Sequence, residues 1–105
     1  MGLPRVQFVD VNDTAELKTS DGGGDMAGFQ ILGTWVGTIT FEARNPSVGD
    51  NWVSIVAVNV ADNVAATTTT ANGIFRIVSD ALDVRARFST DTSGTVNVWP
   101  FQRLV

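Results

Sequence analysis

The sequence predicts an all-β fold: a single antiparallel β-sandwich or barrel, jelly-roll or immunoglobulin-like, with about seven or eight short strands. Apolar and polar residues alternate with period two over most of the chain, and these runs are rich in β-branched and aromatic residues. Clusters of Gly, Asn, Asp and Ser separate the runs at intervals of roughly 8–12 residues, and no segment shows the 3.6-residue period of a helix. The 105 residues predict one domain, 1–105, because they contain no internal repeat and no shift in composition.

The N-terminal part of the chain predicts an arm followed by two strands. Residues 5–11 predict a strand or an extended arm, because Pro4 lacks a backbone N–H and suits the start or the edge of a strand. We treat 1–14 as a possible N-terminal arm. Residues 14–19 predict a short polar strand, and three adjacent glycines after it predict a loop. The next strand is expected at 27–32.

The clearest strand pattern covers residues 34–43. Ile39 and Phe41 share an apolar face, whereas threonines dominate the other face, which is typical of a half-buried antiparallel strand. Residues 52–60 form a more continuous apolar run, which predicts a strand covered on both faces. Together the two segments predict a hairpin over 34–60, whose loop contains Pro and Gly.

The remaining elements are separated by turn-forming residues. Residues 64–71 predict either a thin threonine strand or a loop that crosses between sheets. An Asn-Gly pair follows it and predicts a tight turn, since both residues tolerate positive φ. Beyond that turn we expect strands at 74–79 and 82–89, a turn at 91–94, a last core strand at 95–99 and a C-terminal tail at 100–105.

Large apolar side chains on the inward strand faces form the predicted core. Trp35 lies on an apolar strand face and Trp52 begins the paired strand, so core or interface packing is favoured over a sugar-stacking platform for both rings. The predicted core residues are Trp35, Ile39, Phe41, Trp52, Ile55, Phe75, Ile77, Val84, Phe88, Val96 and Val98.

The composition argues against several classes of function. Seven basic and eleven acidic residues give a net charge of −4, which disfavours nucleic-acid binding because phosphate recognition depends on clustered Lys and Arg. The chain has no Cys and no His, so thiolate nucleophiles, imidazole bases and the usual zinc sites are missing. Most carboxylates fall in predicted turns, where Asp bonds its own backbone rather than calcium. We therefore expect no enzyme activity, no metal and no cofactor. No apolar run is long enough to span a bilayer, so no membrane interaction is expected.

A low content of charged residues indicates contact with a partner. Charged residues make up 17% of the chain, against roughly 25% in typical soluble domains. Part of the surface is therefore expected to be buried by a partner, unless Thr, Asn, Ser and Gln cover it instead. Arg76, Arg85 and Arg87 predict an outward stripe that either pairs across strands with Asp83 or Glu42, or anchors an acidic partner.

Several segments resemble small β-sandwich proteins from the virions of tailed bacteriophages. The resemblance extends over roughly residues 27–99. The segments that carry it are 33–43 (GTWVGTITFEA), 51–53 (NWV), 70–77 (TANGIFRI), 84–87 (VRAR) and 92–96 (TSGTV). Proteins of this group act as capsid decoration (cement) proteins, or occur as modules of tail, fibre and baseplate components.

The resemblance implies a structural role in the virion. A lone module of this size, with two short flanks, implies a cement protein that bridges capsid subunits, on the outer surface of the capsid, as a homotrimer bound to the major capsid protein. The alternative is a tail, fibre or baseplate module that binds carbohydrate or a host receptor. The N-terminus has no signal-peptide pattern, so synthesis in the host cytoplasm is expected. Apolar flanks and the arginine stripe give the expected interface residues: Val6, Phe8, Val9, Arg85, Arg87, Trp99, Phe101 and Leu104.

Overall fold

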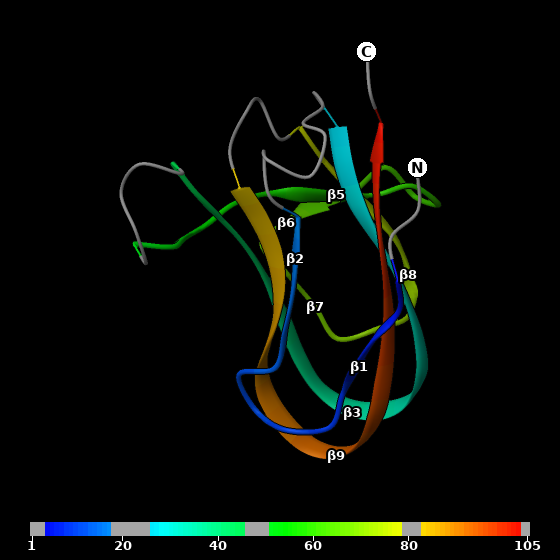
Figure 1. The fold of residues 1–105 in the computed structure, drawn as a ribbon. Coiled ribbons are helices and arrows are strands. Elements are labelled where there is room, and N and C mark those ends of the chain that lie inside the picture. The colour runs from blue at the N-terminus through cyan, green and yellow to red at the C-terminus, as the bar shows by residue number, and fades with distance from the viewer. Residues whose placement is uncertain (1–3, 18–25, 46–50, 79–82, 104–105) are drawn as a thin grey trace.

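The computed structural model describes residues 4–17, 26–45, 51–78 and 83–103, and in these residues it contains nine strands and no helix. All nine strands belong to one antiparallel sheet that is not closed into a barrel, so the predicted all-β class is confirmed (Figure 1). The strands are β1 (Val6–Phe8), β2 (Thr14–Leu17), β3 (Met26–Arg44), β4 (Val53–Ser54), β5 (Ala57–Asn59), β6 (Ala65–Ala66), β7 (Thr68–Thr69), β8 (Gly73–Val78) and β9 (Asp83–Arg103).

Two long strands, β3 and β9, form the centre of the sheet. They pair along their whole lengths, from Met26 opposite Arg103 to Arg44 opposite Asp83. Both strands curve together through the lower end of the molecule in Figure 1, so each strand runs down one side and up the other. Gly94 lies in this bend with a φ of 91°, a conformation that strongly favours glycine. The bend brings the two halves of the sheet face to face, which is compatible with a β-sandwich.

We name the two halves the first and the second layer. The first layer contains β1, β8, β5 and β6 together with residues 26–34 of β3 and 94–103 of β9. The second layer contains β2, β4 and β7 together with residues 37–44 of β3 and 83–91 of β9. Since β1 and β2 flank opposite halves of β9, the N-terminal segment follows the same bend.

The main differences from the predicted elements concern the long strands. Residues 27–32 and 34–43 form one strand, and the expected turn at 91–94 continues as strand through the bend. Residues 100–103, predicted as a tail, pair with β3. The physical reason is the same in each case: the neighbouring long strand supplies hydrogen-bond partners on both sides of the bend, so the chain does not need to turn.

Two shorter segments divide between the layers. The apolar run predicted as one strand at 52–60 forms two short strands, β4 against the second layer and β5 within the first. The threonine-rich segment crosses from β6 in the first layer to β7 in the second. Of the two alternatives for residues 64–71, the crossing between sheets therefore describes the observed path, although each end contributes two residues of strand.

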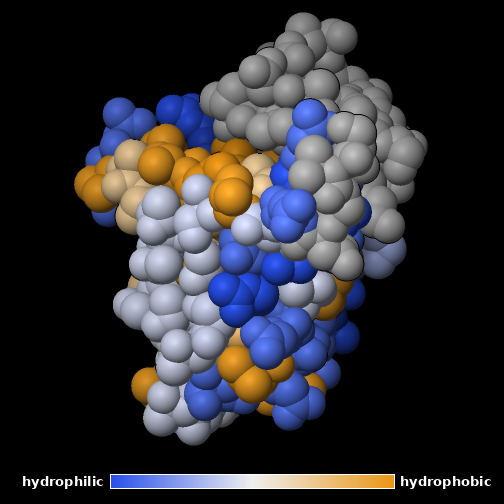
Figure 2. Space-filling view, turned by 90° about the vertical axis from the view of Figure 1, so that its left-hand side faces the viewer, coloured by the Kyte–Doolittle hydropathy of each residue, from blue (hydrophilic) through white to orange (hydrophobic). Residues whose placement is uncertain are grey.

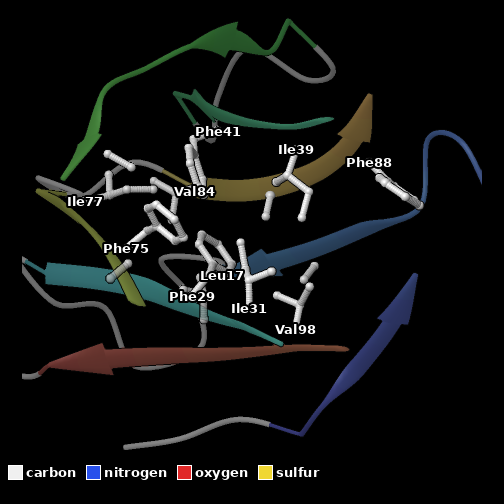
Figure 3. Packing of buried hydrophobic residues seen from close by; sticks show 14 of the residues in the cluster. Leu17, Phe29, Ile31, Ile39, Phe41, Phe75, Ile77, Val84, Phe88 and Val98 are labelled. Atoms are coloured by element: carbon white, nitrogen blue, oxygen red, sulfur yellow. The ribbon is translucent and has the colours of Figure 1, made fainter. Parts of the chain in front are cut away.

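The core fills the space between the layers (Figure 3). Phenylalanines from both layers meet there: Phe29 and Phe41 stack with ring centroids 6.2 Å apart, and Phe41 lies 5.3 Å from Phe75. Ten of the expected core residues are accounted for by this cluster: eight of them are almost fully buried, and two pack against it while partly exposed. The buried ones among those predicted from the sequence include Ile39, Phe41, Phe75, Ile77, Val84, Phe88, Val96 and Val98, and the partly buried ones are Trp35 and Ile55.

Two residues lie in places that the sequence does not predict. Phe8, expected at an interface, is fully buried and stacks on Phe88 with ring centroids 5.9 Å apart. The cause is the pairing of β1 with β9, which makes this strand part of the sheet instead of a free arm. Trp52, expected in the core, is half-buried outside it, against the side chains of Arg44 and Arg85.

Candidate functional site

The outward side of the first layer carries an aromatic surface. Along β9, Val96, Val98 and Pro100 are buried, so the alternation of the strand turns Trp99 and Phe101 to the opposite side. Both aromatic side chains are half-buried. The described strands form only two layers, so none of them covers this side.

Neighbouring strands extend this surface. Trp99 lies opposite Gln30 on β3, and Gln30 lies opposite Ile74 on β8, so the three residues form one row across the sheet. In the next outward-facing row along β3, Leu32 lies opposite Asn97. Leu32 is 42% exposed and Ile74 is 41% exposed. We call this surface the outer face, and its residues are Gln30, Leu32, Ile74, Asn97, Trp99 and Phe101.

Phe101 is held against the backbone of the neighbouring strand. It lies opposite Gly28, and a Cβ atom at that glycine would collide with the Phe101 ring and would lie 2.6 Å from the carbonyl oxygen of Phe75. The missing side chain therefore lets the ring lie close to the sheet. This close approach fixes one end of the outer face.

A polar atom on this face has no partner. The Oδ1 atom of Asn97 is buried and accepts no hydrogen bond in the structure. Leaving a buried acceptor unpaired costs about 1–3 kcal/mol. Aromatic and aliphatic side chains bordered by amides are typical of the centre of a protein–protein interface.

The second layer carries a charged network on its outward side. Glu42 on β3 accepts hydrogen bonds from Arg85 Nε at 2.8 Å and from Arg87 Nε at 3.0 Å. Arg87 also donates through Nη1 to Asn12 Oδ1 at 3.0 Å, which ties the β1–β2 connection to this layer. Figure 2 shows hydrophilic residues in the middle of this side of the molecule.

The arginines keep Glu42 ionised. Its side chain is 9% exposed, and burial alone would raise its pKa. The hydrogen bonds and the positive charges of Arg87 and Arg85 outweigh burial, so the pKa of Glu42 lies below its usual value.

Trp52 covers part of the same network. The Cζ atoms of Arg85 and Arg44 lie 4.2 Å and 4.6 Å from the centre of its ring, within the range of cation–π interactions. Arg44 also pairs with Asp83 at 3.2 Å. The network therefore has an internal structural use: it attaches the segment before β4 to the second layer.

The expected interface residues separate into four groups. Trp99 and Phe101 belong to the outer face, as described above. Arg85 and Arg87 pair with Glu42, which was the cross-strand alternative for the arginine stripe. Val9 is 48% exposed in the β1–β2 connection. Val6 packs partly against the core and Phe8 is buried in it, so neither offers a free side chain. Leu104 lies outside the described residues.

Four residues of the outer face are not among the interface residues that the sequence predicts: Gln30, Leu32, Ile74 and Asn97. The signal for the first two was present, because alternation in the strand predicted at 27–32 places them on one side together. The pairing of β3 with β9 brings them beside Trp99. These two strands are far apart in the chain, so the sequence alone does not show that they are neighbours.

Two features are not found among the described residues. None of them form a group of three or more acidic side chains that could hold a metal ion. The same parts of the chain contain no helix of the length and hydrophobicity that a membrane span requires.

Comparison with known proteins identifies a shared fold. No family model matches the chain, and no curated protein matches it either. Among solved structures, the SPBc2 prophage-derived protein YomS is similar, with a TM-score of 0.72 over 92% of this chain and 91% of that one. The two share this fold. At 14% identity, the likeness shows the arrangement of the strands alone.

Proposed function

We propose that this protein is a structural, non-enzymatic component of a bacteriophage particle, and that it acts as a capsid cement protein. Two independent observations support a phage origin: segments of the sequence resemble virion β-sandwich proteins, and the fold is similar to that of a prophage-derived protein. The observation that carries the binding role is the outer face. It combines half-buried Trp99 and Phe101 with exposed Leu32 and Ile74 on a sheet surface that no described strand covers.

In this proposal the outer face binds protein neighbours on the outer surface of the capsid. The neighbours are the major capsid protein and further copies of this chain in a homotrimer. Aromatic anchors in a rigid sheet suit such a role, because little conformational entropy is lost when they are buried.

The test measures occupancy on purified capsids. Replacing Leu32 by Glu places a charge on the outer face, and replacing Val53 by Glu makes the same kind of change at a residue of the second layer that is 61% exposed. We expect the Leu32→Glu variant to lose at least roughly tenfold in affinity for capsids, while Val53→Glu binds as the unmodified protein does. Equal binding by both variants would reject the outer face as the contact.

Copy number separates this role from the alternative. Quantitative mass spectrometry of particles should find hundreds of copies of a cement protein, but only a few to tens of copies of a tail, fibre or baseplate module. Analytical ultracentrifugation of the free protein tests the proposed homotrimer.

A further inference from the structure

A cavity opens where the chain crosses from one layer to the other. β6 pairs with β5 in the first layer, and β7 pairs with β3 in the second, so Thr67 connects the layers. The carbonyl oxygen of Thr67 accepts a hydrogen bond from Phe41 N at 2.9 Å, which fixes the crossing. The cavity beside it measures about 120 Å³, is half-enclosed, and is lined by residues of β5, β6, β7, β8 and the β5–β6 turn.

One wall of the cavity is polar and rigid. Asn59 and Asp62 line it from β5 and the turn that follows. Asn59 Oδ1 accepts the Ala61 N–H at 2.9 Å, and Asp62 Oδ1 accepts the Val64 N–H at 3.0 Å, so both side chains are held by the backbone of the turn. Asp62 Oδ2 and the Asn59 amide NH₂ have no hydrogen-bond partner in the described part of the chain. They supply an acceptor and a donor, and Thr68 belongs to the same lining.

Apolar residues line the cavity beside Asn59, which pairs with Phe75 across β5 and β8. Phe75 contributes to this lining from β8 and is 5% exposed, while Ala57 and Ala66 leave the space open because their side chains are small. A cavity of about 150 Å³ holds benzene, so this smaller, partly open space admits only part of one six-membered ring. A ligand that fits must have one polar edge for Asp62 and Asn59 and one apolar side for Phe75.

We propose that this cavity binds one neutral pyranose unit of a carbohydrate. The hydroxyl groups of the sugar would donate to Asp62 and accept from Asn59, and its C–H side would pack on Phe75. The inference does not rest on the capsid role, because the cavity and the outer face share no residue. With few contacts available to a single ring, the expected dissociation constant is on the order of 1 mM.

The experiment is an NMR titration of the ¹⁵N-labelled full chain with glucose, galactose, mannose and N-acetylglucosamine, each up to about 100 mM to cover weak binding. We expect at least one sugar to shift the amide signals of Asn59, Asp62, Thr68 and Phe75 in a saturable way. Saturable shifts confined to the outer face, or none with any of the four sugars, would overturn the proposal. So would tighter binding of methylammonium than of every sugar, because it would identify Asp62 as a site for cations.

Three variants tie the signal to the cavity. Asp62→Asn keeps the shape and the acceptor for Val64 N–H but removes the charge, and should weaken binding roughly fivefold. Ala66→Leu fills the space from an exposed position and should abolish binding. Asp10→Asn makes the same chemical change at an exposed residue of the β1–β2 connection, and should bind as the unmodified protein does. Unchanged binding by Asp62→Asn and Ala66→Leu would contradict the proposal that the sugar binds in this cavity. The NMR spectra also report whether each variant is folded. Neither cavity variant should alter occupancy on capsids, so failure here is distinguishable from failure of the capsid role.

Discussion

Glu42 shows how a single residue is stabilised on an outward sheet surface. Two arginines from β9 lie beside it, and both donate hydrogen bonds to its carboxylate. Replacing Glu42 by Gln leaves these arginines facing a neutral group in a site that is little exposed to water. We expect a loss of about 2 kcal/mol in the free energy of unfolding at pH 7, measured by urea denaturation. No loss would mean that solvent screens the arginines effectively.

The same residue predicts a pH dependence. Because the folded state lowers the pKa of Glu42, its stabilising effect is complete above the pKa of the unfolded chain, about 4.3. The effect is lost as the pH falls through the lower pKa of the folded state. The stability difference between the unmodified protein and Glu42→Gln should therefore shrink below about pH 4.3. Glu16→Gln on β2 is the control, and a difference that stays constant to pH 3 would contradict the prediction.

Gly28 determines how closely Phe101 packs on the sheet. A Cβ atom there meets the Phe101 ring and the Phe75 carbonyl oxygen. We expect Gly28→Ala to cost about 2 kcal/mol, measured by thermal or urea unfolding. In the double variant Gly28→Ala with Phe101→Ala, the ring no longer meets the added Cβ atom, so the stability should be partly restored. The recovery should be incomplete because the Phe75 carbonyl oxygen still lies too close to that Cβ atom. Full additivity of the two losses would show that the ring and the glycine do not interact.

At the scale of elements, alternation predicts which residues are extended and which side they face. It correctly places Ile39, Phe41, Val96 and Val98 towards the core. It does not reveal that β3 and β9 are each continuous through a bend, because glycine and polar residues at 91–94 have the same composition as a turn. Whether residues 91–94 form a turn or a continuous strand depends on hydrogen-bond partners from a strand about fifty residues away in the chain. Local propensity carries no information about those partners.

Pairing also explains how much of the candidate site could be predicted. Trp99 and Phe101 stand out because two aromatic residues near the chain end are expected to contact a partner. Arg85 and Arg87 have the same outward alternation, but their acidic partner lies on β3. Strand register decides whether an outward-facing side chain has a partner within the molecule. Here the register is fixed by pairing between distant segments, β3 and β9.

The attachment of β4 gives a prediction about a whole element. This strand has only two residues, and Trp52 beside it contacts the guanidinium groups of Arg44 and Arg85. Trp52→Ala should cost about 1 kcal/mol and raise amide hydrogen exchange at residues 53–55, including Ile55, whose N–H bonds the Phe41 carbonyl oxygen. Trp52→Phe keeps an aromatic ring, so its amide hydrogens at residues 53–55 should exchange more slowly than those of Trp52→Ala. Equal exchange in both variants would show that the ring does not hold the strand.

At the scale of the whole molecule, the sheet joins the two ends of the chain. Residue Met26 pairs with Arg103, and β1 near the N-terminus pairs with the segment 96–98. Most of the stabilising contacts therefore form between segments far apart in sequence, and loop closure must precede them. This topology predicts folding on the millisecond to second scale, which stopped-flow tryptophan fluorescence measures; complete refolding within microseconds would be inconsistent with it.

The C-terminal strand tests this dependence directly. The sequence predicts a tail at 100–105, but Pro100 is buried and residues 100–103 pair with β3. Truncation after Trp99 removes those backbone hydrogen bonds together with the Phe101 ring, and should lower the free energy of unfolding by at least about 3 kcal/mol. Phe101→Ala keeps the backbone pairing, so its loss should be clearly smaller. If the truncated chain and Phe101→Ala were equally stable in urea denaturation, the pairing of these last residues would contribute nothing, and the end of β9 would behave as the tail that its sequence suggests.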